Sequence, residues 1–284
     1  MIRVAGAPIS WGVCEVPGWG HCMPADRVLG EMSALGLTAT ELGPDGYLPV
    51  DPAERAELLG RHHLEVAGGF VPVVLHDPGH DPVPGVVRAL TAWSGVLVLA
   101  AATGADGYDA RPELDAEGWR TLLTNLDRIA AAAADRGVTA TLHPHVGTMV
   151  ERTDEVRRVL DGSAIALCLD TGHLLAGGTD PAALAREVPG RIAHVHLKDV
   201  DAASAARVRA GEVSYTDAVR AGMYRPLGAG DVDIAGIVAA LTAAGYAGWY
   251  VLEQDTMLDA EPAAGEGPVA DVRRSLEHLR EVAA

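Results

Sequence analysis

Four side chains of the types that ligate divalent metal ions recur at one position of a repeating pattern in this sequence. His143, Asp170, His196 and Glu253 each stand at or next to the end of a short apolar segment. Two imidazoles and two carboxylates form a ligand set that suits Mn²⁺, Co²⁺, Zn²⁺ or Fe²⁺. Taken alone, each residue is more often a hydrogen-bonded polar group or a helix cap. Their equivalent positions in four successive units favour one shared metal site.

Three further polar residues lie close to these four in the sequence and could move protons. His173 follows the first carboxylate by three residues, and its alternative role is a hydrogen bond at the entry of a helix. His145 lies two residues after the first imidazole. Lys198 follows His196 by two residues, so on a strand it would share the face of that residue. Such a lysine could bind a carbonyl or hydroxyl oxygen, or transfer a proton if its pKa is lowered. The alternative for Lys198 is a surface ion pair with Asp199.

Four more residues are candidates for contacts with a substrate. Trp11 and Glu41 lie at the ends of the first two apolar segments and could form the wall opposite the metal site, although Trp11 could equally fill the core. Glu151 follows His145 shortly in the chain, and Arg225 precedes the segment PLGAG. These residues complete the predicted site.

Short apolar strands alternate with helical patterns along the whole chain. The predicted strands span 3–9, 38–42, 64–71, 95–101, 138–143, 165–169, 192–197 and 249–253. The predicted helices span 24–35, 51–61, 84–93, 114–136, 153–160, 179–188, 234–244 and 269–282. The segment 202–221 is also helical but polar, and we interpret it as an elaboration of the loop after the seventh strand.

This alternation predicts an α/β fold with a parallel sheet. Eight such units within 284 residues predict a closed TIM (β/α)8 barrel that forms one domain over residues 1–284. An open doubly wound sheet is the alternative. No Gly-x-Gly-x-x-Gly follows the first strand, which excludes the dinucleotide-binding form of that sheet.

The composition excludes several classes of partner. A formal net charge of −17, spread over the chain, opposes binding to nucleic acids and to anionic membranes. The longest apolar run, 96–103, is too short to span a membrane. The N-terminal residues show no signal-peptide pattern. Three widely spaced cysteines form no disulfide framework. We therefore expect a cytoplasmic protein that acts on a small molecule.

Several motifs resemble those of a known family. LDTGHL (169–174), HVHLKDV (194–200), PLGAGDVDIAGIV (226–238) and LEQD (252–255) resemble the xylose-isomerase-like TIM barrels of the sugar phosphate isomerase/epimerase superfamily. Within that superfamily, APISWG (7–12), TELGPDGYLP (40–49) and LHPHVGTMVE (142–151) are most similar to inosose (2-keto-myo-inositol) dehydratases.

The resemblance implies a metal held by Glu, Asp, His and Glu from strands five to eight. The last three fall on Asp170, His196 and Glu253, whereas the first falls on His143, where this chain departs from the common pattern. In ketose 3-epimerases, the first Glu is both a ligand and a proton carrier. A metal-bound imidazole is a poor general base, so the departure favours the dehydratase branch. The implied ion is Mn²⁺ or Co²⁺, with Zn²⁺, Fe²⁺ or Mg²⁺ as alternatives.

The implied reaction is the dehydration of a cyclic polyol ketone through an enolate, catalysed by a metal-dependent lyase. The candidate bases are Glu253, His145 and Lys198, and His173 is the first candidate for the acid that protonates the departing hydroxyl. The first alternative is a sugar isomerase or epimerase that uses the same metal-enediolate chemistry. An apurinic-site endonuclease would need more ligands, and the net charge opposes DNA. A metal-free binding protein is the remaining alternative. The substrate would be a sugar or cyclitol, and a homodimer stays open.

Overall fold

A closed barrel of eight parallel strands forms the centre of the molecule. The computed structural model describes residues 2–91, 93 and 95–283. Each barrel strand pairs in parallel with its two neighbours. In order around the barrel, the strands are β1 (Arg3–Gly6), β2 (Ala39–Glu41), β3 (Glu65–Val73), β4 (Val96–Ala101), β5 (Ala140–Leu142), β6 (Ala166–Asp170), β7 (Ile192–Leu197) and β10 (Trp249–Leu252), which pairs with β1. The predicted TIM (β/α)8 barrel is confirmed.

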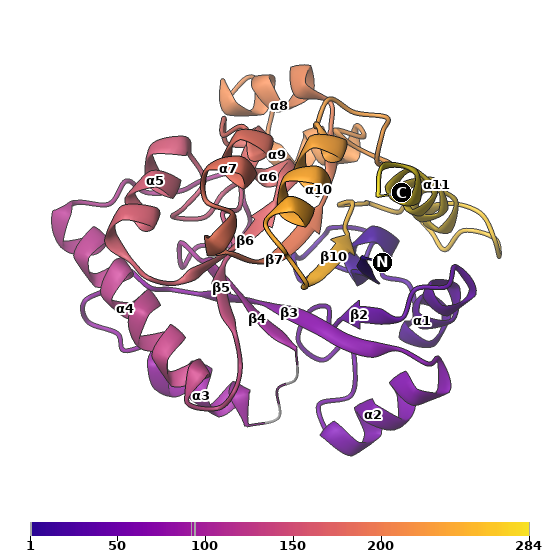
Figure 1. Cartoon of the computed structure of the whole chain (residues 1–284), viewed down its shortest axis with the longest axis horizontal. Coiled ribbons are helices and arrows are strands. Elements are labelled where there is room, and N and C mark those ends of the chain that lie inside the picture. The colour runs from indigo at the N-terminus through magenta and orange to yellow at the C-terminus, as the bar shows by residue number, and fades with distance from the viewer. Residues whose placement is uncertain (1, 92, 94, 284) are drawn as a thin grey trace.

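Helices surround the strands (Figure 1). The α-helices are α1 (Ala25–Ala34), α2 (Pro52–Arg61), α3 (Val83–Leu90), α4 (Ala116–Ala134), α5 (Thr153–Gly162), α6 (Thr171–Ala176), α7 (Pro181–Glu187), α8 (Ala202–Arg209), α9 (Tyr215–Arg220), α10 (Ile234–Ala243) and α11 (Pro268–Val282). Two short 3₁₀ helices are η1 (Pro8–Trp11) and η2 (Pro189–Arg191). The last helix, α11, packs against η1 and so brings the two ends of the chain together. None of the described helices has the length and apolar character needed to cross a membrane.

Aspartate side chains begin several of these helices. Asp51, Asp115, Asp180, Asp201 and Asp233 each accept hydrogen bonds from backbone N–H groups of the first turn of the helix that follows. A carboxylate in this position satisfies donors that have no partner within the helix, and it complements the helix dipole. Part of the large negative charge of the chain therefore stabilises helix starts.

The structure differs from the predicted elements mainly after the sixth and seventh strands. The short helix α6 was not predicted; it begins directly after β6, where Asp170 Oδ1 accepts the N–H of His173 at 2.7 Å. The predicted helix over 202–221 is two helices, α8 and α9, because the chain turns at Gly211 with a φ of 71°. The strands β8 (Asp199–Val200) and β9 (Tyr224–Arg225) form a small antiparallel pair beside them.

Two other predictions need their bounds corrected. The first strand ends at Gly6 and η1 follows, whereas the prediction extended the strand to residue 9. The predicted helix 84–93 is α3 over Val83–Leu90, and position 92 of that prediction lies outside the described residues. Positions 1 and 284 of the predicted domain also lie outside the described residues.

Candidate metal centre at the carboxyl ends of the strands

The four predicted ligands converge at the mouth of the barrel. The atom Asp170 Oδ2 lies 3.4 Å from His143 Nε2 and 3.5 Å from His196 Nδ1, and Glu253 Oε2 lies 2.5 Å from His196 Nδ1. One ligand atom from each residue lies within 4.8 Å of the others. His143 and Glu253 directly follow β5 and β10, whereas Asp170 and His196 belong to β6 and β7. Because carboxyl ends of barrel strands share one rim, equivalent positions bring the side chains together.

The polar atoms at this point contact mainly one another. Asp170 Oδ2, His196 Nδ1 and Glu253 Oε2 are all buried, and in the described part of the chain their charged neighbours within 4 Å belong to the cluster itself or to Lys198. Buried carboxylate oxygens are costly unless positive charge balances them. Two carboxylate oxygens and two imidazole nitrogens that face one point can bind a divalent cation. The residues therefore fit a metal ion.

Each of the two imidazoles has a hydrogen-bond contact on the nitrogen that points away from the cluster. His143 Nδ1 lies 2.9 Å from the carbonyl oxygen of Pro144, and His196 Nε2 lies 3.0 Å from Glu41 Oε1. If each of these nitrogens carries the proton, the lone pairs of His143 Nε2 and His196 Nδ1 face the cluster. A hydrogen bond on the far nitrogen commonly fixes the tautomer of a metal-binding histidine in this way.

A proton can take the place of the ion at His196. Burial lowers the pKa of this imidazole, but the neighbouring Cys168, Glu253 and Glu41 outweigh burial and raise the pKa well above its usual range. In the absence of a metal, the ring is therefore a cation among carboxylates. Binding of an ion must release this proton, so metal affinity should rise with pH.

Glu41 supports the cluster from across the barrel. Its Oε1 atom accepts hydrogen bonds from His194 Nε2 at 2.7 Å and from His196 Nε2 at 3.0 Å. Because β2 and β7 are not neighbours in the barrel, these contacts cross its interior. The prediction placed Glu41 among substrate contacts; it does line the pocket, but this oxygen orients a candidate ligand.

We expect the substitution Glu41→Gln to weaken metal binding by about 10–100-fold, the usual effect of losing such a supporting group. The amide keeps the shape of the side chain but removes the charge that stabilises the orientation of His196. The dissociation constant can be measured by competition with a coloured chelator. The exposed Glu65→Gln is a matched control that should change nothing. Equal affinity in both variants would show that Glu41 does not support the site.

Lys198 is fully buried and stands beside three carboxylates. Its Nζ atom donates to Asp255 Oδ1 at 2.6 Å and to Glu253 Oε1 at 3.3 Å, and it lies 3.5 Å from Asp170 Oδ2. Burial lowers the pKa of this amine, but the three carboxylates outweigh it and raise the pKa well above its usual range. The lysine is thus a fixed cation, which contradicts the prediction that it could act as a base through a lowered pKa.

The alternative prediction for Lys198, an ion pair with Asp199 at the surface, is also wrong. The carboxylate of Asp199 is buried and accepts backbone N–H groups of Gly228, Gly230 and Val232. It holds the PLGAGDV loop against the end of β7 and makes no contact with the ammonium group in the described structure.

His145 and His173 form a stacked pair, with ring centroids 3.7 Å apart. His145 lines the pocket, and its Nδ1 lies 2.7 Å from the carbonyl oxygen of Val146. Burial is the main cause that lowers the pKa of His145 to about 3, with a further contribution from Lys198, so this ring is neutral at pH 7. His173 lies behind it, fully buried, with Nε2 3.1 Å from Lys198 Nζ. His173 is absent from the described pocket lining, which argues against a direct role as the acid.

Trp11 belongs to the core and does not form the opposite wall. Its side chain is fully buried, and Nε1 donates to Glu31 Oε2 at 2.8 Å. The η1 helix turns the chain after β1, and it carries Trp11 away from the pocket. Trp19, eight residues further along, lines the pocket instead.

Glu151 and Arg225 also lie away from the pocket. The carboxylate of Glu151 accepts the N–H of Gly147 at 2.8 Å and lies 3.4 Å from Arg111 Nε, so it stabilises the loop after β5. Arg225 is part of β9, where its side chain is 45% exposed and lies near Asp201. Both predictions of substrate contacts are therefore corrected.

The pocket above the cluster is acidic and aromatic. Among the described residues, its lining contains no Arg or Lys side chain. Its lining residues are Ala7, Pro8, Ile9, Val13, Cys14, Glu15, Trp19, Glu41, Gly43, Pro44, Phe70, Tyr108, His143, His145, His196, Glu253 and Asp255. Carboxylates that accept hydrogen bonds and aromatic faces that pack on C–H groups suit a neutral ring with several hydroxyl groups.

Several further residues that contact the predicted ligands or the pocket were not among the predicted ones. Asp255, His194 and Cys168 each stand two positions from a predicted ligand, so strand periodicity could have identified them. Tyr215 and Tyr224 come from α9 and β9; the Tyr215 hydroxyl donates to Asp255, and the Tyr224 hydroxyl lies 3.4 Å from His173 Nδ1. Nothing in the sequence of that elaboration indicates that it reaches the barrel mouth.

Comparisons with known proteins identify the family to which this barrel belongs. A model of the family described as xylose isomerase-like TIM barrel matches residues 29–282. The rhizopine catabolism protein MocC of Rhizobium meliloti is 34% identical over 267 residues, which cover 89% of this chain and 82% of that protein. The inosose dehydratase of Geobacillus kaustophilus is 32% identical over 272 residues, which cover 89% of this chain and 87% of that enzyme.

Solved structures show the same fold. An L-ribulose 3-epimerase superposes with a TM-score of 0.70 at 17% identity, covering 100% of this chain and 95% of the epimerase. The IOLI protein, whose structure has a bound zinc atom, superposes with a TM-score of 0.69 at 13% identity, covering 99% of this chain and 98% of that protein. The barrel, its rim of ligand-type residues and these matches lead to one conclusion: the chain belongs to the xylose isomerase-like TIM barrel family.

Proposed function

We propose that this protein is a metal-dependent lyase that removes water from a cyclic polyol ketone, as the inosose dehydratases among its relatives do by name. The observation that carries the proposal is the cluster of His143, Asp170, His196 and Glu253, whose ligand atoms face one point beside a pocket. The identity to inosose dehydratases over most of the chain supports this branch of the family over others.

The lining of the pocket supports an unphosphorylated substrate. A phosphate group is usually bound by Arg, Lys or a helix N-terminus, whereas Glu15, Glu41 and Asp255 give this lining a negative charge. Phe70 and Tyr108 add flat apolar surfaces. A neutral cyclitol ketone can donate its hydroxyl protons to the carboxylates and pack its C–H faces on the rings.

His143, Asp170, His196 and Glu253 would hold the ion, with Mn²⁺ or Co²⁺ as our first choice and Zn²⁺, Fe²⁺ or Mg²⁺ as alternatives. A bound divalent ion supplies Lewis-acid polarisation of the ketone, which makes the adjacent C–H more acidic. Lys198 adds a fixed positive charge next to Glu253 and Asp255 and keeps both carboxylates in place.

Of the three candidate bases, His145 is the one we favour for its position, although its lowered pKa makes it a weaker base than a free imidazole. Lys198 keeps its proton. Glu253 Oε1 accepts a hydrogen bond from Lys198, and Glu253 Oε2 faces the metal position beside His196. His145 is neutral and lines the pocket, and the contact of its Nδ1 with Val146 leaves Nε2 as the nitrogen with the lone pair. His173, proposed from the sequence as the acid, instead positions His145 by stacking beneath it.

We expect His145→Asn to lower kcat by about 10²–10⁴-fold, the usual contribution of general base catalysis, without changing the number of metal ions bound. The turnover of a saturating ketone and the metal content of the same preparation provide the two measurements. The exposed His80→Asn is the matched control and should keep full activity. Normal turnover of the His145 variant would assign the base to another group.

The reaction itself is tested with protein that has been treated with EDTA and then reloaded with single metals. Incubation with 2-keto-myo-inositol should produce a conjugated chromophore in the near ultraviolet, because loss of water leaves C=C beside C=O. Fructose in a parallel reaction should show no inversion at carbon 3. If the reloaded protein epimerises ketoses and forms no enone from the cyclic ketone, the epimerase alternative replaces this proposal.

A further inference from the structure

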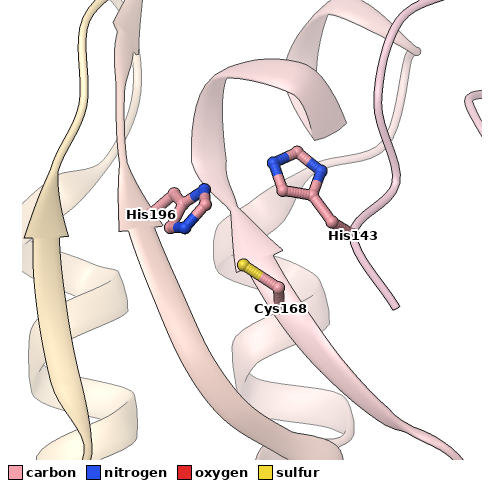
Figure 2. A group of neighbouring side chains, drawn as sticks. All are labelled: His143, Cys168 and His196. Carbon is pink, nitrogen blue, oxygen red and sulfur yellow. The ribbon is translucent and has the colours of Figure 1, made fainter. Parts of the chain in front are cut away.

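A cysteine lies directly below the metal-ligand cluster, inside the barrel. Cys168 precedes Asp170 by two residues on β6, so its side chain shares the inward face of that strand one layer deeper. Figure 2 shows its sulfur between the rings of His143 and His196, which come from the two flanking segments of the barrel. The thiol is free and fully buried.

The three side chains form a ligand group of their own. Cys168 Sγ and one nitrogen from each of His143 and His196 lie within 4.8 Å of one another. His196 Nδ1 is buried and faces carboxylates, so a cation that replaces its proton would keep a positive charge at this point. One sulfur and two imidazoles are a common partial ligand set for tetrahedral zinc, in which a water molecule can take the fourth position.

The two imidazoles therefore belong to two overlapping sets. With Asp170 and Glu253 they offer two hard oxygen ligands, which suit Mn²⁺, Mg²⁺ or Co²⁺. With Cys168 they offer a soft sulfur ligand, which suits Zn²⁺ and the still softer Cd²⁺. Because His143 Nδ1 contacts Pro144 and His196 Nε2 contacts Glu41, each ring has one nitrogen left for an ion, and the two sets exclude each other.

We propose that His143, Cys168 and His196 form a second, deeper metal position that takes thiophilic divalent cations and competes with the ion held by Asp170 and Glu253. On binding, Cys168 Sγ and the two imidazole nitrogens form bonds to the ion, the S–H bond and any N–H bond at the bound nitrogens break, and these protons pass to the solvent, with no change of oxidation state. An ion drawn to this deeper position lies further from the pocket and from its substrate. Thiophilic cations thus act as inhibitors of the proposed enzyme.

The test is a titration of metal-free protein with Cd²⁺, followed by ultraviolet difference absorption, which detects cadmium–thiolate bonds. Cys14 and Cys22 are replaced with serine beforehand, because Cys14 lines the pocket, Cys22 is exposed, and both could bind cadmium themselves. We expect the charge-transfer band to saturate at about one ion per chain and to be lost in Cys168→Ser or Cys168→Ala. Two substitutions ensure that a folding defect in one variant leaves the test intact.

Competition with Mn²⁺ separates this inference from the proposed function. Cadmium should displace bound Mn²⁺, detected as free Mn²⁺ by electron paramagnetic resonance, at concentrations about tenfold lower or more in the protein with Cys168 than in the serine variant. In the absence of cadmium, the Mn²⁺ affinities of the two proteins should differ by less than this factor, because the set with Asp170 and Glu253 does not include Cys168. A band that is absent, or that persists without Cys168, would overturn the deeper position but leave the lyase proposal standing.

Discussion

Replacing Asp170 with alanine is expected to abolish metal binding and activity together. Its Oδ2 atom lies within 3.5 Å of His143 Nε2, His196 Nδ1 and Lys198 Nζ, so it is the central negative charge of the cluster. Loss of an anionic ligand should weaken metal binding by more than about 100-fold, since even supporting groups contribute 10–100-fold. Lewis-acid stabilisation contributes several kcal/mol, so turnover should fall by at least about a thousandfold.

The substitution removes a helix cap as well as a metal ligand, because Asp170 Oδ1 accepts the N–H of His173 at the start of α6. A control must therefore show what the loss of a helix cap does by itself. Asp180→Ala removes a comparable cap from α7 and should cost about 1 kcal/mol of stability while leaving the metal content unchanged. Metal content is measured by elemental analysis after gel filtration, and stability by thermal unfolding. Full metal occupancy in the Asp170 variant would show that the cluster has been misassigned.

The substitution Lys198→Met is expected to have the largest effect on stability in metal-free protein. It leaves Asp255, Glu253 and Asp170 buried without their cation, a change that typically costs about 3–5 kcal/mol. Urea unfolding at pH 7 measures the loss. The exposed pair of Arg157 and Glu187 provides the control, since Arg157→Met should cost no more than about 1 kcal/mol.

The stability deficit of the Lys198→Met variant should depend on pH. Burial raises the pKa of Glu253, but His196 and Lys198 outweigh it and lower the pKa to about 2. A carboxylate with a lowered pKa stabilises the folded state above its unfolded pKa of about 4.3, and this stabilisation is lost as the pH falls towards the folded value. Without Lys198 much of that contribution disappears. The deficit of the variant should therefore be largest at pH 7 and shrink below about pH 5. An equal deficit at both pH values would contradict the charge argument.

The four central residues could be predicted from the sequence because the barrel repeats. Each repeat ends a strand on the same rim, so His143, Asp170, His196 and Glu253 share a place that does not depend on loop conformation. The barrel itself follows from the alternation of strands and helices. This alternation can be recognised even when the predicted boundaries of each element are wrong by a few residues.

Residues on the loops between the barrel elements could not be placed in this way. Trp11 follows β1 by five residues, and the turn of η1 buries it in the core. Arg225 lies on a short strand within the elaboration after β7, which the sequence showed only as a polar helical segment. Lys198 was placed on the correct face, but its charge state depends on Asp255, a partner whose position becomes clear only in the folded barrel.

The central claim is that these four side chains hold one divalent ion, and anomalous diffraction tests it most directly. Crystals of the protein soaked in Mn²⁺ are measured on both sides of the manganese absorption edge. The account predicts one strong anomalous peak per chain, within bonding distance of His143 Nε2, Asp170 Oδ2, His196 Nδ1 and Glu253 Oε2. A well-ordered barrel with no peak between these atoms, or with its manganese elsewhere, would contradict it.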